Sequence, residues 1–186
     1  FSKTPEKNIK INGTISYVSQ NPWILNDTIK NNILFFKEMN EEKYKKVIEI
    51  CELVQDIKLF SGGDMTEIGE KGVGLSGGQK ARLAIARAIY SDADIYLFDD
   101  PLSALDAYVG MKIFNQVFVD YLKGKTRIIV THALQYVSFT DRVLYMNEGR
   151  VQWFGNANQL ETQEFYKHFI ENIKNKKDKE TPEMNE

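Results

Sequence analysis

The sequence has little of several features that would point to particular classes of protein. Its 186 residues include one cysteine, Cys51, so no disulfide can form within the chain. No apolar run approaches the ~18 residues of a membrane-spanning helix, and no charged-then-apolar secretory signal opens the sequence. The net charge of −2 gives no bulk attraction for nucleic acid. What remains, with 42% hydrophobic and 27% charged residues, is the composition of roughly one globular domain with its own core.

Strand patterns recur along the chain. Residues 14–18 are rich in β-branched and aromatic types, which predicts a short strand. Residues 95–98 are a continuous apolar run, as in a strand that is buried on both faces, and residues 127–130 form a second buried run. A further strand at 142–146 leads into a predicted hairpin at 147–150.

Helix patterns lie between these strands. Apolar residues at three- and four-residue steps predict a helix over 41–56, with Asn40 as its cap. A long glycine-containing loop at 62–78 leads into a predicted helix at 77–90, and another helix is expected at about 106–121. Because strand and helix alternate, the sequence predicts a parallel sheet wrapped by helices.

The segment Leu75-Ser76-Gly77-Gly78-Gln79 lies where the long loop becomes a helix. The first backbone amides of a helix are unpaired and point outward, and glycines let a phosphate approach them without a Cβ in the way. The segment is therefore a candidate phosphate site. The alternative is structural, because Ser76 and Gln79 have the spacing of a capping box.

Polar residues follow three of the predicted strands. Gln20 comes after the first strand, Asp99 and Asp100 end the second, and His132 ends the third. Ligands of open α/β sheets bind outside the carboxyl ends of the strands, and an aspartate there can hold Mg²⁺ directly or through water. The structural alternatives are an acidic turn before Pro101 and a histidine without a functional role.

Five motifs stand in order: Gln20 after a strand, Leu75-Ser76-Gly77-Gly78-Gln79, a strand ending in Asp99, Ser103-Ala104-Leu105-Asp106, and His132. Over about residues 13–165 the chain thereby resembles the nucleotide-binding domain of ATP-binding-cassette transporters. The resemblance implies an α/β fold with a P-loop NTPase-like parallel sheet core and an inserted α-helical subdomain, N-terminally truncated. It implies the following organisation: a partial domain over 1–171, with its helical subdomain at about 26–91 and its α/β core at 13–25 and 92–171, and a disordered charged linker over 172–186.

The resemblance also implies roles for individual residues, in three sets. The catalytic residues would be Asp100, His132 and Gln20; the nucleotide-binding residues would be Leu75, Ser76, Gly77, Gly78, Gln79 and Asp106; the metal ligands would be Asp99 and Gln20. In family terms Gln20 resembles the Q-loop glutamine, Asp99 the Walker B aspartate and His132 the switch histidine. The residues from Ser76 to Gln79 resemble the signature, which binds the γ-phosphate of a nucleotide held by an opposite domain, and Asp106 resembles the D-loop aspartate.

The sequence departs from the family pattern in two places. It contains no Gly-x-x-x-x-Gly-Lys-Ser/Thr loop: Gly124-Lys125-Thr126 imitates the end of one, but Val119 stands where the first glycine should be, and the triplet precedes a strand. The chain alone is therefore expected to bind ATP weakly and to lack ATPase activity. The second departure is Asp100, which stands where the family usually has a catalytic glutamate.

Longer matches narrow the resemblance. The segments 20–24, 66–72 and 98–106 are similar to the first nucleotide-binding domain of subfamily C, the multidrug-resistance-associated transporters. This implies an ATP-driven exporter that uses ATP and Mg²⁺, pairs with a second nucleotide-binding domain and joins transmembrane domains of the same polypeptide at the cytoplasmic face of a membrane. One alternative is a nucleotide-gated regulatory cassette of a channel or channel regulator. Another is a soluble cassette protein acting on ribosomes or DNA.

Overall fold

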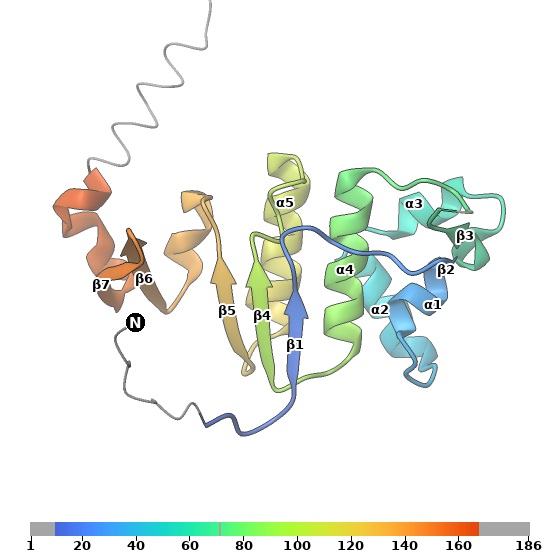
Figure 1. Ribbon diagram of the computed structural model, residues 1–186, viewed down its shortest axis with the longest axis horizontal. Coiled ribbons are helices and arrows are strands. Elements are labelled where there is room, and N and C mark those ends of the chain that lie inside the picture. Colours follow the sequence, from blue (N-terminus) through green and yellow to red (C-terminus); the bar gives the residue numbers. More distant parts are fainter. Residues whose placement is uncertain (1–9, 71, 168–186) are drawn as a thin grey trace, which may run out of the picture. The chain divides into compact units, whose positions relative to one another are not determined.

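The computed structural model describes residues 10–70 and 72–167 (Figure 1). The chain divides into two compact units between His132 and Ala133. Among the described residues, no helix has the length and apolar character needed to cross a membrane.

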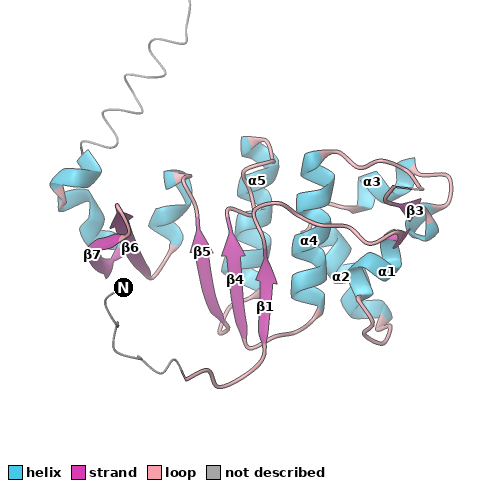
Figure 2. Cartoon of the chain, in the orientation of Figure 1, coloured by secondary structure: helices cyan, strands magenta, loops and turns pink. Residues whose placement is uncertain are grey.

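The first unit contains a three-stranded parallel sheet in the order β1-β4-β5 (Figure 2). Its strands are β1 (Ile15–Val18), β4 (Ile95–Asp99) and β5 (Thr126–Val130). The register pairs Val18 with Phe98 and Asp99 with Val130, so the carboxyl ends of all three strands meet at one edge. The predicted parallel α/β sheet is thus confirmed.

One face of this sheet packs against a long helical segment. That segment begins as α5 (Ala107–Ile113) and continues as the π-helical η2 (Phe114–Tyr121), which lies behind the strands in Figure 1. The rings of Phe98 and Phe118 meet edge to face, with their centroids 4.6 Å apart. Such aromatic pairs add to the stabilisation that burial of the two rings already supplies.

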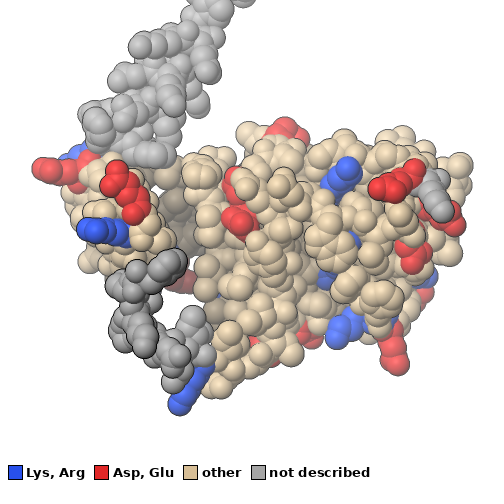
Figure 3. Space-filling model, viewed as in Figure 1, with Lys and Arg blue, Asp and Glu red and all other residues tan. Residues whose placement is uncertain are grey.

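The opposite face of the sheet is open in the part of the chain that the structure describes. About half of the surface of Ile15, Tyr17, Ile128 and Val130 is exposed there, and Figure 3 shows few charged side chains over these strands. The prediction that the strands are buried on both faces is therefore wrong for the described residues. Apolar side chains alternate between the two faces of a strand, and the described helices cover only one of them.

A mostly helical part of the same unit connects β1 to β4. Its elements are β2 (Asp27–Thr28), α1 (Ile29–Leu34), α2 (Glu41–Ile50), α3 (Val54–Leu59), η1 (Gly63–Met65), β3 (Glu67–Ile68) and α4 (Gly77–Tyr90). The helix predicted over 77–90 has the observed bounds, and Asn40 caps α2 as expected. Most of α4 is buried, because it packs against α1, α2 and β1.

The single helix predicted over 41–56 is wrong, because two helices, α2 and α3, replace it. The chain turns at Glu52, whose φ of 55° lies in the left-handed region that ends helices. After this turn the backbone carbonyl of Glu52 accepts a hydrogen bond from the Arg82 guanidinium, and its carboxylate pairs with Lys112 at 2.8 Å. Tertiary contacts therefore override the helical periodicity at this point.

The second unit holds an antiparallel hairpin of β6 (Arg142–Asn147) and β7 (Arg150–Asn156). The turn contains Glu148 and Gly149, both at positive φ, and confirms the predicted hairpin. Two 3₁₀ segments flank it: η3 (Leu134–Phe139) and η4 (Ala157–Thr162). The linker expected at 172–186 lies outside the described residues.

Candidate functional site

Four of the predicted site residues lie at the carboxyl edge of the sheet. Gln20 follows β1, Asp99 and Asp100 end β4, and His132 follows β5. The parallel register brings these strand ends side by side. We call the four residues the strand-edge group. Gln20 and His132 are exposed, so both side chains are accessible to a ligand at this edge.

The two adjacent carboxylates have different surroundings. Asp99 completes β4, and the Tyr17 hydroxyl donates to its Oδ2 at 3.4 Å. Asp100 leaves the strand with a φ of 45°, in the left-handed region, and its amide donates to the Val130 carbonyl at 2.8 Å. Its Oδ1 accepts a hydrogen bond from the Thr131 hydroxyl at 3.4 Å. Strained backbone of this kind is concentrated at functional sites, where the surrounding structure holds it in place.

The strand-edge group suits a hard cation such as Mg²⁺. The Asp99 carboxylate and the Gln20 amide both offer oxygen ligands, which this ion prefers. Within the described ranges no three His, Cys, Asp or Glu side chains are grouped closely enough to enclose a metal. Mg²⁺ usually binds to one or two carboxylates and takes water and phosphate oxygens as its other ligands. The donors present match that mode of binding.

The start of α4 forms the second part of the candidate site. The Ser76 hydroxyl accepts from the Gln79 amide at 3.2 Å, and the Gln79 Oε1 accepts from the Ser76 amide at 2.9 Å. The predicted capping box is therefore present. The first bond within the helix runs from the Lys80 amide to the Ser76 carbonyl at 3.0 Å. The capping box and this bond use the amides on either side of Gly77 and Gly78, whose own amides stand at the open end of the helix.

The two glycines differ in what surrounds them. A Cβ on Gly77 would meet nothing closer than the Ala104 Cβ at 3.9 Å, so packing within this unit does not require glycine there. A Cβ on Gly78 would lie 3.2 Å from the Ala104 carbonyl oxygen, a tight contact. Gly78 thus lets α4 approach the loop after β4, whereas the missing side chain at Gly77 leaves the helix start open to an approaching group. Leu75 precedes the cap on the same segment.

Asp106 has a structural contact of its own. It caps α5, because its Oδ1 accepts from the amides of Tyr108 at 3.1 Å and Val109 at 2.9 Å. An aspartate in this position satisfies amides that the start of a helix leaves unpaired. The residue before it, Leu105, lies beside Gly78, so Asp106 belongs to the loop that contacts the start of α4.

Two residues that the sequence motifs missed contact this region. The Gln79 Nε2 donates to the Asp56 Oδ1 at 3.0 Å, and the Arg82 guanidinium pairs with the Asp56 Oδ2 at 2.8 Å. The sequence places Asp56 at the end of a predicted helix, and no spacing rule links it to α4. The only available signal is that Gln79 and Arg82, three positions apart, share one face of their helix.

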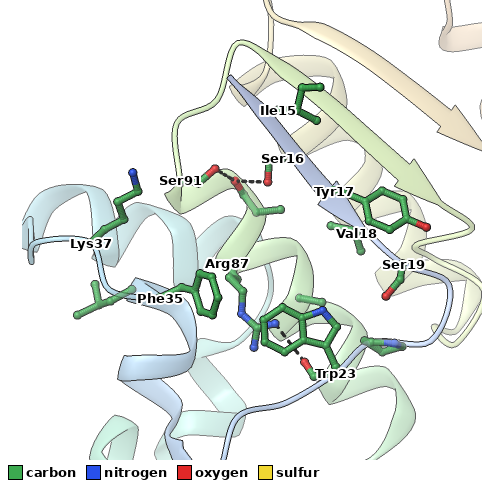
Figure 4. Close-up of a pocket in the computed structure, with 14 residues that line it drawn as sticks. Ile15, Ser16, Tyr17, Val18, Ser19, Trp23, Phe35, Lys37, Arg87 and Ser91 are labelled. Atoms are coloured by element: carbon green, nitrogen blue, oxygen red, sulfur yellow. Dashed lines mark hydrogen bonds between the residues drawn. The ribbon is translucent and has the colours of Figure 1, made fainter. Parts of the chain in front are cut away.

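An aromatic surface lies beside the start of the helical part. The Trp23 and Phe35 rings meet edge to face at 5.4 Å, and Phe36, next to Phe35, is 90% exposed. Figure 4 shows the Arg87 guanidinium against Trp23, with its central carbon 3.8 Å from the ring centroid. Together with β1, the side chains of Trp23, Phe35 and Arg87 border a pocket of about 240 Å³. We call Trp23, Phe35 and Phe36 the aromatic patch.

Comparisons with known proteins give one consistent result. Residues 2–103 match the family model described as "ABC transporter". The chain is 54% identical over 155 residues, 82% of its length, to "ABC transporter C family member 8" of Dictyostelium discoideum. It is 51% and 50% identical over 154 residues to "ATP-binding cassette sub-family C member 2" of Mus musculus and of Homo sapiens, again over 82% of its length. The chain spans about a tenth of the length of these relatives, 10% in each case.

Proposed function

The chain belongs to the ABC transporter family, and on that premise we propose that it is part of a nucleotide-binding domain that powers export of a substrate across a membrane. In this proposal ATP is bound and hydrolysed at an interface between two such domains. The observation that carries the proposal is the start of α4, where the capping box leaves the amides of Gly77 and Gly78 for a ligand. Amides at a helix start, with the positive end of the helix dipole behind them, favour an anionic group such as a phosphate.

In the proposed reaction the strand-edge group serves the ATP bound by this domain. Asp99 and Gln20 would hold Mg²⁺, which when bound neutralises charge on the β- and γ-phosphates. Water would attack the γ-phosphorus, the bond to the bridging oxygen would break, and ADP would leave. Asp100 would orient this water and accept its proton, and His132 would contact the γ-phosphate. Little covalent chemistry is asked of the protein, because positioning and charge neutralisation supply most of the rate.

The start of α4 serves the opposite domain in this proposal. Leu75, the segment from Ser76 to Gln79, and Asp106 would approach a nucleotide held by the partner. The contact between Gly78 and the loop that ends at Asp106 supports this, because it links the two segments within one chain. The phosphate-gripping loop with its lysine is not among these 186 residues, so tests of this proposal use the full-length protein.

The aromatic patch supports the proposed contact with transmembrane domains of the same polypeptide, at the cytoplasmic face of the membrane. An exposed cluster of Trp and Phe is typical of a buried interface anchor. Arg87 holds Trp23 of this patch in place, since its guanidinium donates to the Trp23 carbonyl at 3.1 Å and stacks on the Trp23 ring. The patch follows Gln20 closely in the chain. A shift of Gln20 on nucleotide binding could therefore be transmitted through the segment 20–36 to the membrane domains.

A second candidate function is a nucleotide-gated regulatory cassette of a channel or channel regulator. The observation that favours it is Asp100, whose shorter side chain is engaged by the Thr131 hydroxyl. A site that holds ATP without fast turnover suits gating. A transport assay on reconstituted full-length protein separates the two functions, because only an exporter couples ATP hydrolysis to substrate accumulation.

The test of the proposed function is Gly77→Asp in the full-length protein. A carboxylate at the helix start would repel the γ-phosphate, and ATPase activity should fall on the order of 100-fold. Local packing has room for the new side chain, so the fold should survive. Gly74→Asp is the matched control, because it adds the same charge in the preceding loop, where a Cβ also meets open space. Wild-type turnover in Gly77→Asp would refute the assignment.

A further inference from the structure

Gln79 makes two hydrogen bonds that require one orientation of its side-chain amide. Its Oε1 accepts from the Ser76 amide at 2.9 Å, and its Nε2 donates to the Asp56 Oδ1 at 3.0 Å. Rotation of the amide by 180° would place a donor against the Ser76 N–H and an acceptor against the carboxylate. An ionised carboxylate accepts hydrogen bonds and donates none. Asp56 therefore selects the orientation of Gln79 that closes the capping box.

Asp56 is itself held by a charged partner on α4. The Arg82 guanidinium pairs with the Asp56 Oδ2 at 2.8 Å, and its Nε donates to the Gly78 carbonyl at 3.3 Å. The same guanidinium donates to the Glu52 carbonyl. Asp56 and Arg82 thus contact both residues that follow Gly77 in the first turn of the helix.

This pair is shielded from water. The side chains of Arg82 and Asp56 are 16% and 15% exposed, whereas those of the nearby surface pair Lys46 and Glu49 are 55% and 65% exposed. Exposed pairs contribute little, since solvent screens them and both side chains lose freedom. A partly buried pair that also donates to backbone carbonyls holds its partners in a fixed geometry.

We propose that Asp56 is a positioning residue for ATP hydrolysis: through Gln79 and Arg82 it fixes the first turn of α4, so that the Gly77 and Gly78 amides point at the phosphate to be transferred. The inference rests on the proposed function of that helix start. Asp56 does not touch the nucleotide. It links α3 to the signature, so a shift of α3 would move the amides that face the phosphate.

The proposal predicts which kinetic constant changes. The amides of α4 would meet a nucleotide that is already gripped by the opposite domain, so loosening them should not weaken nucleotide capture. A misplacement of about 1 Å at a reacting centre can cost up to ~100-fold in rate. Loss of Asp56 should therefore lower kcat and leave KM for ATP nearly unchanged.

The experiment measures kcat and KM for ATP in the full-length protein. Asp56→Leu removes the acceptor at similar volume, and kcat should fall about tenfold with KM unchanged within about twofold. Glu49→Gln is the matched control in the same helical part, because it breaks only the exposed pair with Lys46. Gly77→Asp is carried in parallel as the direct test of the helix start.

A second pair of variants keeps the proposal testable if Asp56→Leu does not fold: it exchanges the donor at Gln79 and the acceptor at Asp56. Gln79→Glu keeps the acceptor for the Ser76 amide but sets a carboxylate against Asp56, so kcat should again fall about tenfold. Adding Asp56→Asn gives that carboxylate a donor, and the double variant should recover most of the lost kcat. Recovery at constant KM is a result that general destabilisation does not produce.

Each outcome decides one claim. If Gly77→Asp is inactive while Asp56→Leu turns over like wild type, the positioning role is wrong and the proposed function stands. If kcat falls only together with a matching rise in KM, or if the double variant is no better than Gln79→Glu alone, the positioning role is also wrong. Wild-type turnover in Gly77→Asp would remove the proposed function itself, whatever Asp56 does.

Discussion

The buried Arg87 allows a stability prediction whose size follows from its contacts. The residue is 8% exposed, and its guanidinium donates to the Asn32 carbonyl and the Asn32 Oδ1, each at 2.8 Å, and to the Trp23 carbonyl at 3.1 Å. Its guanidinium stacks on the Trp23 ring at 3.8 Å. Asn32 in turn donates to the Thr28 carbonyl at 3.0 Å, so α1 and α4 share one polar network. The substitution Arg87→Met removes Arg87 from this network at similar side-chain length.

Opposing contributions set the expected magnitude. Hydrogen bonds to a charged group contribute about 1.5–3 kcal/mol each, and a cation–π contact contributes about 0.5–2 kcal/mol. Burial of the cation opposes these gains and lowers the pKa of Arg87 to about 10. Because bonds in one network do not add, we use the cost of leaving a buried acceptor without its donor, about 1–3 kcal/mol, for the neutral oxygens that Arg87→Met leaves behind. Arg87→Met should lower the free energy of unfolding by about that amount.

Urea unfolding of the purified domain, followed by tryptophan fluorescence, measures this change. Arg87→Lys keeps the charge but lacks the planar fork, so it should recover less than half of the loss. Arg150→Met is the matched control, because Arg150 is exposed on the hairpin and its loss should change stability by less than about 0.5 kcal/mol. A loss below about 1 kcal/mol in Arg87→Met, or a wild-type midpoint in Arg87→Lys, would show that the network contributes little.

Two further predictions concern single carboxylates. The side chain of Asp100 is one methylene shorter than that of glutamate, which places its carboxylate on the order of 1 Å further from the attacking water, so Asp100→Glu in the full-length protein should raise single-turnover hydrolysis at this domain's own ATP site at least several-fold. An unchanged rate, with the ATP sites of this domain and of its partner domain turning over equally, would show that Asp100 does not make the two sites unequal. Asp94 accepts hydrogen bonds from the Thr14 amide at 2.8 Å and the Thr14 hydroxyl at 2.9 Å, which hold the pKa of this carboxyl below 3.8. The folded state then binds fewer protons than the unfolded state, so stability is present above pH 3.8 and is lost as the pH falls below it. Urea midpoints across this range should depend less on pH in Asp94→Asn, and an identical slope in both proteins would contradict the argument.

Local rules explain why much of the fold was predictable. The start of α4 follows from a serine and a glutamine at capping-box spacing, and the presence of β4 and β5 follows from apolar runs that end in polar residues. The break at Glu52 was not predictable, because a glutamate at positive φ is intrinsically unfavourable and is held there by Arg82 and Lys112. The open face of the sheet was also missed. A continuous apolar run indicates that both faces of a strand are apolar, but it does not determine which elements of the fold cover each face.

The capping and ligand interpretations of the signature segment are compatible, and the structure explains why. The box between Ser76 and Gln79 satisfies the amides of these two residues, and the bond from Lys80 begins the regular helix. The two amides that neither interaction uses belong to the two glycines. A cap that consumed the amide of Gly77 or Gly78 would compete with a phosphate, whereas this one fixes the turn and leaves both amides at its open end. Substitution of Ser76 would therefore lower stability and hydrolysis together. Substitution of Asp56 is the better test of the helix start, because it alters the first turn of α4 without removing the Ser76 hydroxyl that caps it.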